Sequence, residues 1–393
     1  MSDIEYSIAG KQLKLNSAED VEFIAKDLSD KSDIEKIDLS GNTIGIESSE
    51  RISEILTKFQ HSLKEINLSD IFTGRLNTEV PKCLDHLLPT LLKFPKLTTI
   101  NLSDNALGLQ TIEPIENYLA KAYTLEHLIL SNNGMGPFSG ERIGKALYKL
   151  STLKKQKKYP SLKTFICGRN RLENGSMKYL ALGLINHKDL QEVRLYQNGI
   201  RPIGIATLLS GLKQNQKLKV LDLQDNTLTS LGSSAIASNL GSWTALEELN
   251  LNDCLTKSKG FLHILTNLPL VKDLKVLKLQ YNELDKTALT KLYELIDSGK
   301  VTVQKLEING NKLEEDDELI EKFVELFEDK EIDDLDEMEG EDSDEEDEDD
   351  EEDDEEVEII DFVALGKELD GTDEDKDEAV DDVAEELQKT HIN

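Results

Sequence analysis

The chain has 393 residues and is strongly acidic, with 79 aspartates and glutamates against 45 lysines and arginines and a formal net charge of −34. Such a charge disfavours binding to nucleic acid or to an anionic membrane and favours basic proteins as partners. No apolar run approaches the ~18 residues of a membrane span, and residues 1–10 lack the pattern of an export signal.

The three cysteines, Cys83, Cys167 and Cys254, are far apart in the sequence. An odd number of cysteines without an export signal indicates a reducing compartment, and neither they nor the six scattered histidines have the spacing of a metal site. We therefore expect no metal, and a protein of the cytosol or nucleus.

Residues 1–33 are expected to form an N-terminal cap. Ile8, Leu13 and Leu15 predict an atypical first strand. A short helix follows, indicated by the apolar residues Val21, Phe23, Ile24 and Leu28. A cap is needed because the open edge of a repeat array would otherwise pair with other chains or aggregate.

One pattern, LxxLxLxxNxL, recurs ten times between residues 34 and 313. The copies are 28 or 29 residues apart, except for two longer intervals of 34 and 37. They begin at Ile34, Leu63, Leu97, Leu125, Leu162, Leu190, Leu218, Leu246, Leu274 and Val303. Ten copies in near-constant register identify the leucine-rich repeat.

Each repeat predicts one strand and one helix. Leu97, Ile100 and Leu102 alternate as a half-buried strand does. Helical spacing follows the strands, as at Ile205, Leu208, Leu209 and Leu212. We therefore predict an α/β fold, a ribonuclease-inhibitor-like solenoid crescent with parallel strands on the concave face and α-helices on the convex face.

The asparagine of the pattern takes a turn position, where its amide can bond the backbone of a neighbouring repeat. It recurs at Asn42, Asn105, Asn133, Asn170, Asn198, Asn226, Asn282 and Asn311. A structural role is favoured for the whole set. Ile71 and Cys254 replace it in two repeats.

Two repeats carry insertions, which in solenoids often mark the binding face. The stretch Leu63 to Arg75 reads LKEINLSDIFTGR, and its second half departs from the pattern. We expect a loop that presents Arg75. The second insertion ends in a basic run, Lys154 to Lys158, which is either a solvated helix end or a contact with an acidic segment of a partner.

A polar row is expected along one rim, where strands turn into helices. The stretch Ile166 to Lys178, ICGRNRLENGSMK, contributes several of its members. The predicted partner-binding residues are Asp70, Thr73, Asp104, Asn133, Arg169, Arg171, Glu173, Asn198 and Asp225, with Asn132 and Arg75 as the candidates closest to catalysis. No triad and no phosphate-binding glycine loop is present, so we expect no active site of the chain's own.

Residues 314–330 predict a capping helix with the apolar residues Leu319, Ile320, Phe323, Val324 and Phe327 on one stripe. From Glu331 to Glu356, 21 of 26 residues are acidic and none is basic, which predicts a disordered run. The run serves either solubility or the steering of a basic partner. Residues 357–393 are expected to be a flexible segment with two apolar clusters, which are either transient helices or docking peptides.

Several motifs together resemble one family. DIFTGR (Asp70 to Arg75), LSDNALG (Leu102 to Gly108), NNGMGP (Asn132 to Pro137), ICGRNRLENGSMK and VLDLQDNT (Val220 to Thr227) are similar to the GTPase-activating proteins of Ran, of the fungal type. The resemblance extends from the N-terminal cap to the acidic run, nearly the entire chain. The additional domain of the vertebrate members is not seen.

The resemblance implies a partner and a reaction. The protein would bind Ran in its GTP form and stimulate GTP hydrolysis in support of nucleocytoplasmic transport. Mg²⁺ and GTP would be bound by Ran, so that no cofactor belongs to this chain. We expect a monomer in the cytoplasm, with perinuclear location, shuttling, and a Ran-binding protein in a ternary complex left open.

Two mechanisms remain possible from the residues. Arg75 is the candidate for an arginine inserted in trans, a device worth about 10³–10⁵ in rate in other GTPase systems. The resemblance implies instead that the activator orders the catalytic glutamine of Ran, with Asn132 beside that glutamine and Arg75 supporting the interface. We follow the second mechanism.

Two rival functions predict different behaviour. A binding scaffold of the ribonuclease-inhibitor type would make contacts over the concave face and change no rate. An acidic leucine-rich-repeat histone chaperone would need its acidic run and not Arg75. Hydrolysis of GTP by Ran, with and without this protein, distinguishes all three.

Overall fold

The computed structural model describes residues 4–314, 316–338 and 358–371. The chain divides into two compact units, Met1–Val357 and Glu358–Asn393.

Within the larger unit, the described residues build a twelve-stranded sheet, in which all neighbouring strands run parallel. Apart from β2 and β4, the strands follow one another across it in sequence order, as a solenoid requires. Its strands are β1 (Glu5–Ser7), β3 (Lys36–Asp38), β5 (Glu65–Asn67), β6 (Thr99–Asn101), β7 (His127–Ile129), β8 (Thr164–Ile166), β9 (Glu192–Arg194), β10 (Val220–Asp222), β11 (Glu248–Asn250), β12 (Val276–Lys278), β13 (Lys305–Glu307) and β14 (Glu331–Ile332). A separate pair joins β2 (Lys14–Leu15) and β4 (Thr43–Ile44).

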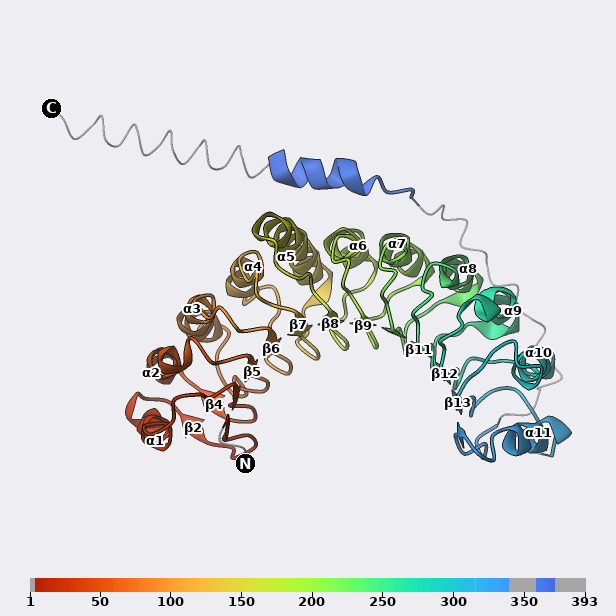
Figure 1. Ribbon diagram of the computed structural model, residues 1–393, viewed down its shortest axis with the longest axis horizontal. Helices are drawn as coiled ribbons and strands as arrows, with labels where there is room; N and C mark the ends of the chain where they lie inside the picture. Colours follow the sequence, from red (N-terminus) through yellow and green to blue (C-terminus); the bar gives the residue numbers. More distant parts are fainter. Residues whose placement is uncertain (1–3, 315, 339–357, 372–393) are drawn as a thin grey trace. The chain divides into compact units, whose positions relative to one another are not determined.

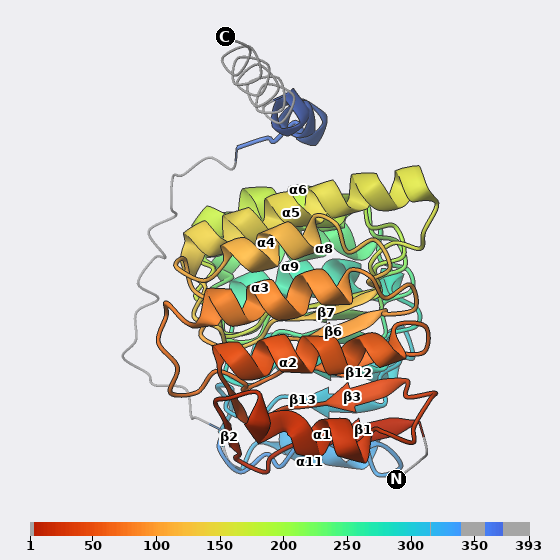
Figure 2. The ribbon, with the colours of Figure 1, turned by 90° about the vertical axis from the view of Figure 1, so that its left-hand side faces the viewer.

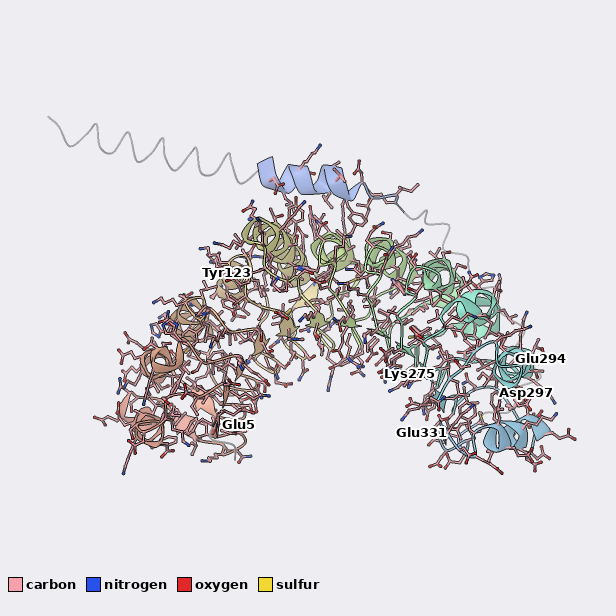
Figure 3. All side chains as sticks on the ribbon, in the orientation of Figure 1. Glu5, Tyr123, Lys275, Glu294, Asp297 and Glu331 are labelled. Carbon is pink, nitrogen blue, oxygen red and sulfur yellow. The ribbon has the colours of Figure 1, made fainter. Side chains whose placement is uncertain are left out.

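Helices cover one side of this sheet, and Figures 1 and 2 show them side by side along the outside of the arc. They are α1 (Glu22–Asp27), α2 (Ile46–Leu56), α3 (Val80–Leu91), α4 (Glu113–Leu119), α5 (Gly136–Lys157), α6 (Met177–Ile185), α7 (Pro202–Leu212), α8 (Thr229–Leu240), α9 (Lys257–Asn267), α10 (Lys286–Asp297) and α11 (Glu318–Leu326). Short 3-10 helices lie at Glu19–Val21, Thr57–Phe59, Asn174–Ser176 and Leu268–Leu270. Figure 3 places Lys275 and Glu331 on the inner side and Glu294 and Asp297 on the outer side.

The predicted solenoid, with parallel strands inside and helices outside, is confirmed. Its core is continuous because the apolar faces of strand and helix meet between the layers. Ile205, Leu208, Leu209 and Leu212 of α7 are fully buried, together with Leu221 of β10. No repeat could bury these side chains alone.

The repeat asparagines form a ladder through this core. The backbone N–H of Asn105 donates to Asn133 Oδ1 over 2.7 Å, and the N–H of Asn133 donates to Asn170 Oδ1 over 2.9 Å. The side-chain amide of Asn105 donates to the carbonyl of Leu68 in the preceding repeat. At Cys254 the thiol takes over this donor role toward Leu223 O. The ladder satisfies buried turn backbone, so the predicted structural role has a geometric basis.

The C-terminal end departs from the expectation drawn from composition. The acidic run was predicted to lack packed structure from residue 331, yet β14 pairs with β13 and Met338 is buried. Asp333 accepts backbone N–H bonds from Ile308 and Asn309, which fixes the segment against the last repeat. The expectation is therefore wrong for residues 331–338, and residues 339–356 lie outside the described residues.

The C-terminal cap and the smaller unit each contain a helix. α11 lies within the predicted capping range, with Leu319, Phe323 and Phe327 buried, although Val324 is exposed. In the smaller unit, residues 362–371 are helical, and the carboxylate of Asp361 accepts N–H bonds at the start of that helix. The helix covers most of the first of the two apolar clusters predicted beyond the acidic run, Ile359 to Leu369.

Among the described residues no helix is long and apolar enough to cross a membrane. The three cysteines are buried free thiols.

Candidate functional site

The rim at which strands turn into helices has a regular backbone geometry. One residue per repeat, just before the ladder position, adopts a left-handed conformation with φ between 49° and 69°. We call these residues the rim row: Gly41, Asp70, Asp104, Asn132, Arg169, Gln197, Asp225, Asp253, Tyr281 and Gly310. From Gly41 to Tyr281, each donates its N–H to a carbonyl of the following repeat over 2.7–3.1 Å. The row is thus held rigidly at repeat spacing.

Asn132 is one of the two members of the rim row, with Gln197, that carry a carboxamide side chain. It is exposed, and its Nδ2 donates to Asp104 Oδ1 over 2.7 Å. Its backbone N–H donates to Gly168 O over 2.9 Å, so both main chain and side chain are fixed. One amide N–H and the Oδ1 lone pairs then stay available to a partner.

Arg75 does not extend outward as the loop position suggested. Its Nη2 donates to Asn16 Oδ1 over 2.8 Å and to the carbonyls of Leu15 and Thr43, each over 3.2 Å. The guanidinium therefore ties the insertion after β5 to the N-terminal cap and to β4. Arg75 is half-buried, and its Nε has no partner among the described residues.

Asp70 and Thr73 lie in the same insertion as Arg75. The Thr73 hydroxyl donates to the Asp70 carboxylate, while Thr73 O accepts a bond from the Thr43 hydroxyl. Ile71 replaces the ladder asparagine and is fully buried, with its N–H bonded to Asn105 Oδ1. These bonds give the DIFTGR loop one conformation on the second repeat.

Asn133 and Asn198 do not belong in the predicted contact set. Both are almost completely buried, and both amides are used in the ladder. Each follows a left-handed rim residue, so the chain direction turns the neighbouring side chain inward. Because a partner cannot reach these two amides, we correct their assignment to a structural role.

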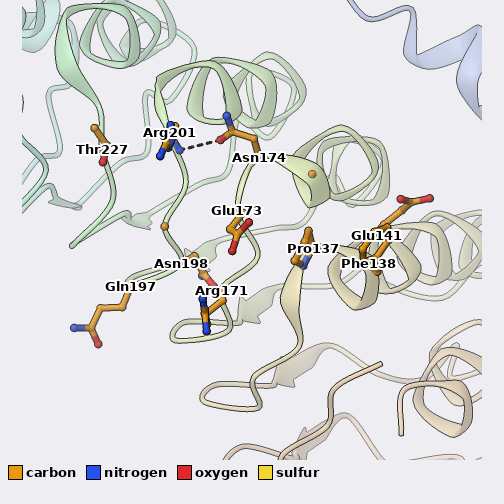
Figure 4. Close-up of a pocket in the computed structure, with 12 residues that line it drawn as sticks. Pro137, Phe138, Glu141, Arg171, Glu173, Asn174, Gln197, Asn198, Arg201 and Thr227 are labelled. Carbon is orange, nitrogen blue, oxygen red and sulfur yellow. Dashed lines mark hydrogen bonds between the residues drawn. The ribbon is translucent and has the colours of Figure 1, made fainter. Parts of the chain in front are cut away.

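A hollow of about 760 Å³ lies along the rim from the fourth to the seventh repeat. Figure 4 shows Arg171, Glu173 and Asn198 between Pro137 and Phe138 on one side and Gln197 and Arg201 on the other. The N–H of Arg201 donates to Asn174 Oδ1 over 2.9 Å. The predicted residues Arg171 and Glu173 therefore share one concave surface.

The remaining predicted residues extend the rim on either side of the hollow. Arg169 belongs to the rim row and is exposed. Asp225, two repeats further on, accepts a bond from Gln197 Nε2 over 2.8 Å. This amide–carboxylate pair has the same form as that of Asn132 and Asp104.

The basic run at the C-terminal end of α5 is only partly available to a partner. Lys154 is buried, and its ammonium donates to Tyr123 O over 3.0 Å and to Pro160 O over 2.8 Å. Burial lowers the pKa of Lys154 to about 8. Lys155, Lys157 and Lys158 are exposed, so the two interpretations of this run apply to these three lysines.

Sequence reasoning missed Phe138, the exposed aromatic wall of the hollow. Its side chain is 68% exposed at the first turn of α5. An apolar residue directly after a rim loop, outside the repeat pattern, is the signal that could have found it. The described residues contain no cluster of histidine, cysteine and carboxylate side chains suited to hold a metal.

Comparisons with known proteins give a consistent result. The chain is 48% identical to Ran GTPase-activating protein 1 of Saccharomyces cerevisiae over 340 residues, which is 83% of this chain and 83% of that protein. It is 42% identical to Ran GTPase-activating protein 2 of Caenorhabditis elegans, over 50% of this chain and 21% of that protein. For Ran GTPase-activating protein 1 of Xenopus laevis the identity is 37%, over 51% of this chain and 35% of that protein.

Two further comparisons concern the repeat. A model of the leucine-rich repeat family matches residues 214–237. Among solved structures, an internalin of Listeria monocytogenes aligns with a TM-score of 0.40 and 17% identity, covering 76% of this chain and 86% of that one.

Proposed function

Because the chain belongs to the family of Ran GTPase-activating proteins, we propose that it binds Ran in its GTP form and accelerates GTP hydrolysis by ordering a glutamine of Ran. GTP and Mg²⁺ would be bound by Ran, and this chain would contribute no cofactor. The activity would maintain a Ran gradient for nucleocytoplasmic transport, with the protein acting as a cytoplasmic monomer.

The pair formed by Asn132 and Asp104 carries the proposal. A carboxamide that already donates one N–H to a fixed carboxylate has a defined orientation, and its second N–H and its Oδ1 can pair with another carboxamide. Holding a reacting group in place in this way lowers the entropic part of a barrier, and a misplacement of about 1 Å can cost ~10² in rate. Asn132 would act on the partner's glutamine, and Asp104 would position Asn132.

The hydrogen bonds that Arg75 makes within this chain are a second argument for the same mechanism. A guanidinium that bridges Leu15, Asn16 and Thr43 would have to break these three bonds before it could reach a nucleotide on another protein. Its role here is to hold the rim loop, in agreement with the indirect role assigned to it above. A pure binding scaffold stays the alternative, and it predicts no change in rate.

Single-turnover hydrolysis by purified GTP-loaded Ran, with saturating amounts of this protein, tests the proposal. We expect a strong acceleration by the parent protein and a loss of about 10² or more in the maximal rate for Asn132→Ala. Asp253→Asn is the matched control, because Asp253 has the same left-handed geometry in the rim row four repeats away.

Three outcomes would count against the proposal. Parent protein that leaves the rate of Ran unchanged would favour the scaffold. Full activity of Asn132→Ala, together with a loss of all activity in Arg75→Ala at saturating partner, would reverse the two assignments. An equal loss of maximal rate in Asp253→Asn and Asn132→Ala would show that the rate depends on any change in the rim row and not on Asn132 itself.

A further inference from the structure

The seven arginines of the chain fall into two groups. Four are engaged: Arg51 with Glu22 and Glu54, Arg142 with Glu116, Arg194 with three carboxylates, and Arg75 with the acceptors described above. The side chains of the other three, Arg169, Arg171 and Arg201, form no hydrogen bond or ion pair within the described residues, and all three are exposed. We call these three the open arginines.

The open arginines share one place in the fold. Arg169 and Arg171 lie in the loop between β8 and α6, and Arg201 directly precedes α7 in the next repeat. In a chain with a net charge of −34, unpaired guanidiniums gathered on two adjacent repeats are unexpected, because carboxylates to neutralise them are abundant. The three guanidinium groups therefore stay available to a partner.

The backbone of two of these residues is also unusual. Arg169 and Arg171 adopt φ values of 57° and 54°, a left-handed conformation that long side chains seldom occupy. Glycine or asparagine would fit both positions with less strain. At Arg169 this conformation belongs to the rim row as a whole, where Gln197 and Tyr281 share it, so the backbone by itself does not single out the arginines.

Two of the three open arginines border the hollow that begins at Phe138. Arg171 and Arg201 line it together with the exposed Phe138 ring. Two carboxylates also line it, but Glu141 is paired with Lys145 over 2.6 Å, so that Glu173 alone opposes the two arginines. A hollow with an aromatic wall and a positive rim suits a segment that carries an apolar side chain beside carboxylates.

This surface is continuous with the rim that carries Asn132. The N–H of Asn132 donates to Gly168 O, and the N–H of Gly136 donates to Asn170 O over 2.9 Å. The loops of the fourth and fifth repeats are therefore bonded to each other at two points. A protein seated on Asn132 would extend over the open arginines.

We propose that the hollow and the open arginines bind an acidic segment of the GTP-loaded GTPase, with one apolar side chain of that segment against Phe138. This inference rests on the proposed function and adds to it the chemistry of a second contact. Asn132 determines the rate of the bound complex, whereas the open arginines determine how readily the complex forms.

The test measures hydrolysis by GTP-loaded Ran at increasing Ran concentration, with catalytic amounts of the full chain. We expect the double variant Arg171→Gln/Arg201→Gln to raise KM about tenfold or more while kcat stays within about twofold of the parent. Phe138→Ala is expected to raise KM similarly, and it removes an exposed side chain whose loss does not threaten folding. KM of the parent should rise with salt, and the arginine variant should show a smaller salt dependence.

Lys213→Gln is the matched control. Arg201 and Lys213 flank the two ends of α7, so both changes remove one exposed positive charge from the same helix but at opposite edges of the solenoid. We expect Lys213→Gln to leave KM as it is in the parent. A rise in KM as large as that of Arg201→Gln would show a general charge effect and overturn the inference.

The remaining outcomes separate this inference from the function on which it rests. If the parent protein does not accelerate hydrolysis, the proposed function fails. If the parent is active and the double variant keeps the parental KM, only the inference fails. A lower KM in the double variant would overturn it as well, because it would mean that the open arginines hold the chain's own acidic run and thereby hinder the partner.

A cross-linking experiment identifies the occupant. Because the three native cysteines are buried, Phe138→Cys introduces one accessible thiol at the hollow. A reagent joining thiols to carboxylates should link residue 138 to an aspartate- or glutamate-rich segment of GTP-loaded Ran. Links confined to the acidic run of this chain would contradict the inference.

Discussion

At the scale of single residues, Arg75 shows how an arginine near a catalytic rim can act through structure. Its Nη2 bridges Asn16 of the N-terminal cap and the carbonyls of Leu15 and Thr43. Hydrogen bonds from a charged donor are worth about 1.5–3 kcal/mol each, and lysine is shorter and ends in a tetrahedral ammonium rather than a planar guanidinium. The bonds of Arg75 therefore fix the loop that carries Asp70 and Thr73.

We predict that Arg75→Lys destabilises the N-terminal cap by about 1–3 kcal/mol and weakens activity through a mobile rim loop. Asn16→Ala removes one acceptor of Arg75 without changing Arg75 itself, and it should produce a smaller effect in the same direction. Chemical denaturation and amide hydrogen exchange of residues 4–16 measure the first effect, and single-turnover hydrolysis measures the second.

An inserted arginine would give a different pattern. Arg75→Lys would then lower the maximal rate by about 10³ or more with no loss of cap protection, and Asn16→Ala would have full activity. That result would remove the structural role given to Arg75 here.

The residue scale also shows what the repeat pattern predicts and what it leaves open. The pattern places Asn132 and Asn133 on the same loop, but only the left-handed backbone at Asn132 decides that one amide is exposed and the next is buried. The hydrogen-bond partners of Arg75, Asn16 and Thr43, lie 59 and 32 residues away in the sequence, so no local sequence motif predicts them. Periodicity predicts the positions of side chains better than it predicts their partners.

At the scale of the helices, one position in three successive repeats ties the helix end to the preceding repeat. His187, Asn215 and Trp243 are spaced 28 residues apart and are fully buried. Asn215 and Trp243 donate to the carbonyls of Leu184 and Leu212. His187 Nε2 lies 3.2 Å from Leu147 O, while its Nδ1 accepts the Leu162 N–H over 3.1 Å. These contacts require a neutral imidazole with its proton on Nε2.

His187 should make the stability of the array sensitive to acid. Burial, with Lys154 nearby, lowers its pKa from 6.5 to about 3. The unfolded chain then binds the proton more readily, so the stabilisation is present above pH 6.5 and is lost as the pH falls toward 3. We predict a loss of about 2.5 kcal/mol from this residue between pH 7 and pH 4.5.

The variant His187→Asn tests this, because asparagine is the residue that the next repeat uses at this position. We expect His187→Asn to be less stable than the parent at pH 7, and the difference to shrink or reverse at pH 4.5. Urea unfolding at the two pH values measures both quantities, with exposed His61→Asn as the control for the substitution. An equal difference at both pH values would contradict the prediction.

At the scale of the whole array, the sequence pattern predicts ten repeats but not where the fold ends. The acidic run contains only three large apolar residues, Ile332, Leu335 and Met338, and all three pack against the core. Composition averaged over the run hides them, because a short strand paired to an existing edge needs few apolar residues. The carboxylate of Asp333 is an acceptor for backbone N–H groups of the last repeat, so an acidic residue here serves packing.

Two truncations separate this structural segment from the rest of the acidic run. A chain ending at Met338 keeps β14, the Asp333 bonds and the buried Met338, whereas a chain ending at Lys330 loses all of them. Loss of one buried apolar side chain and of bonds to a charged acceptor should cost about 3 kcal/mol or more. The exposed edge of β13 should also promote association between copies.

We therefore expect the chain ending at Met338 to unfold in urea at or above the midpoint of the full chain, and the chain ending at Lys330 to unfold at a lower midpoint than the chain ending at Met338. Both truncations remove residues 339–393, so relief of charge repulsion among these residues changes the stability of both truncated chains equally. The difference between their two midpoints therefore measures the contribution of residues 331–338 alone. If the two truncated chains shared one midpoint, residues 331–338 would add nothing to stability and the array would end at α11, as composition suggested. A lower midpoint only for the shorter chain would show that the solenoid is closed by the first residues of its own acidic run.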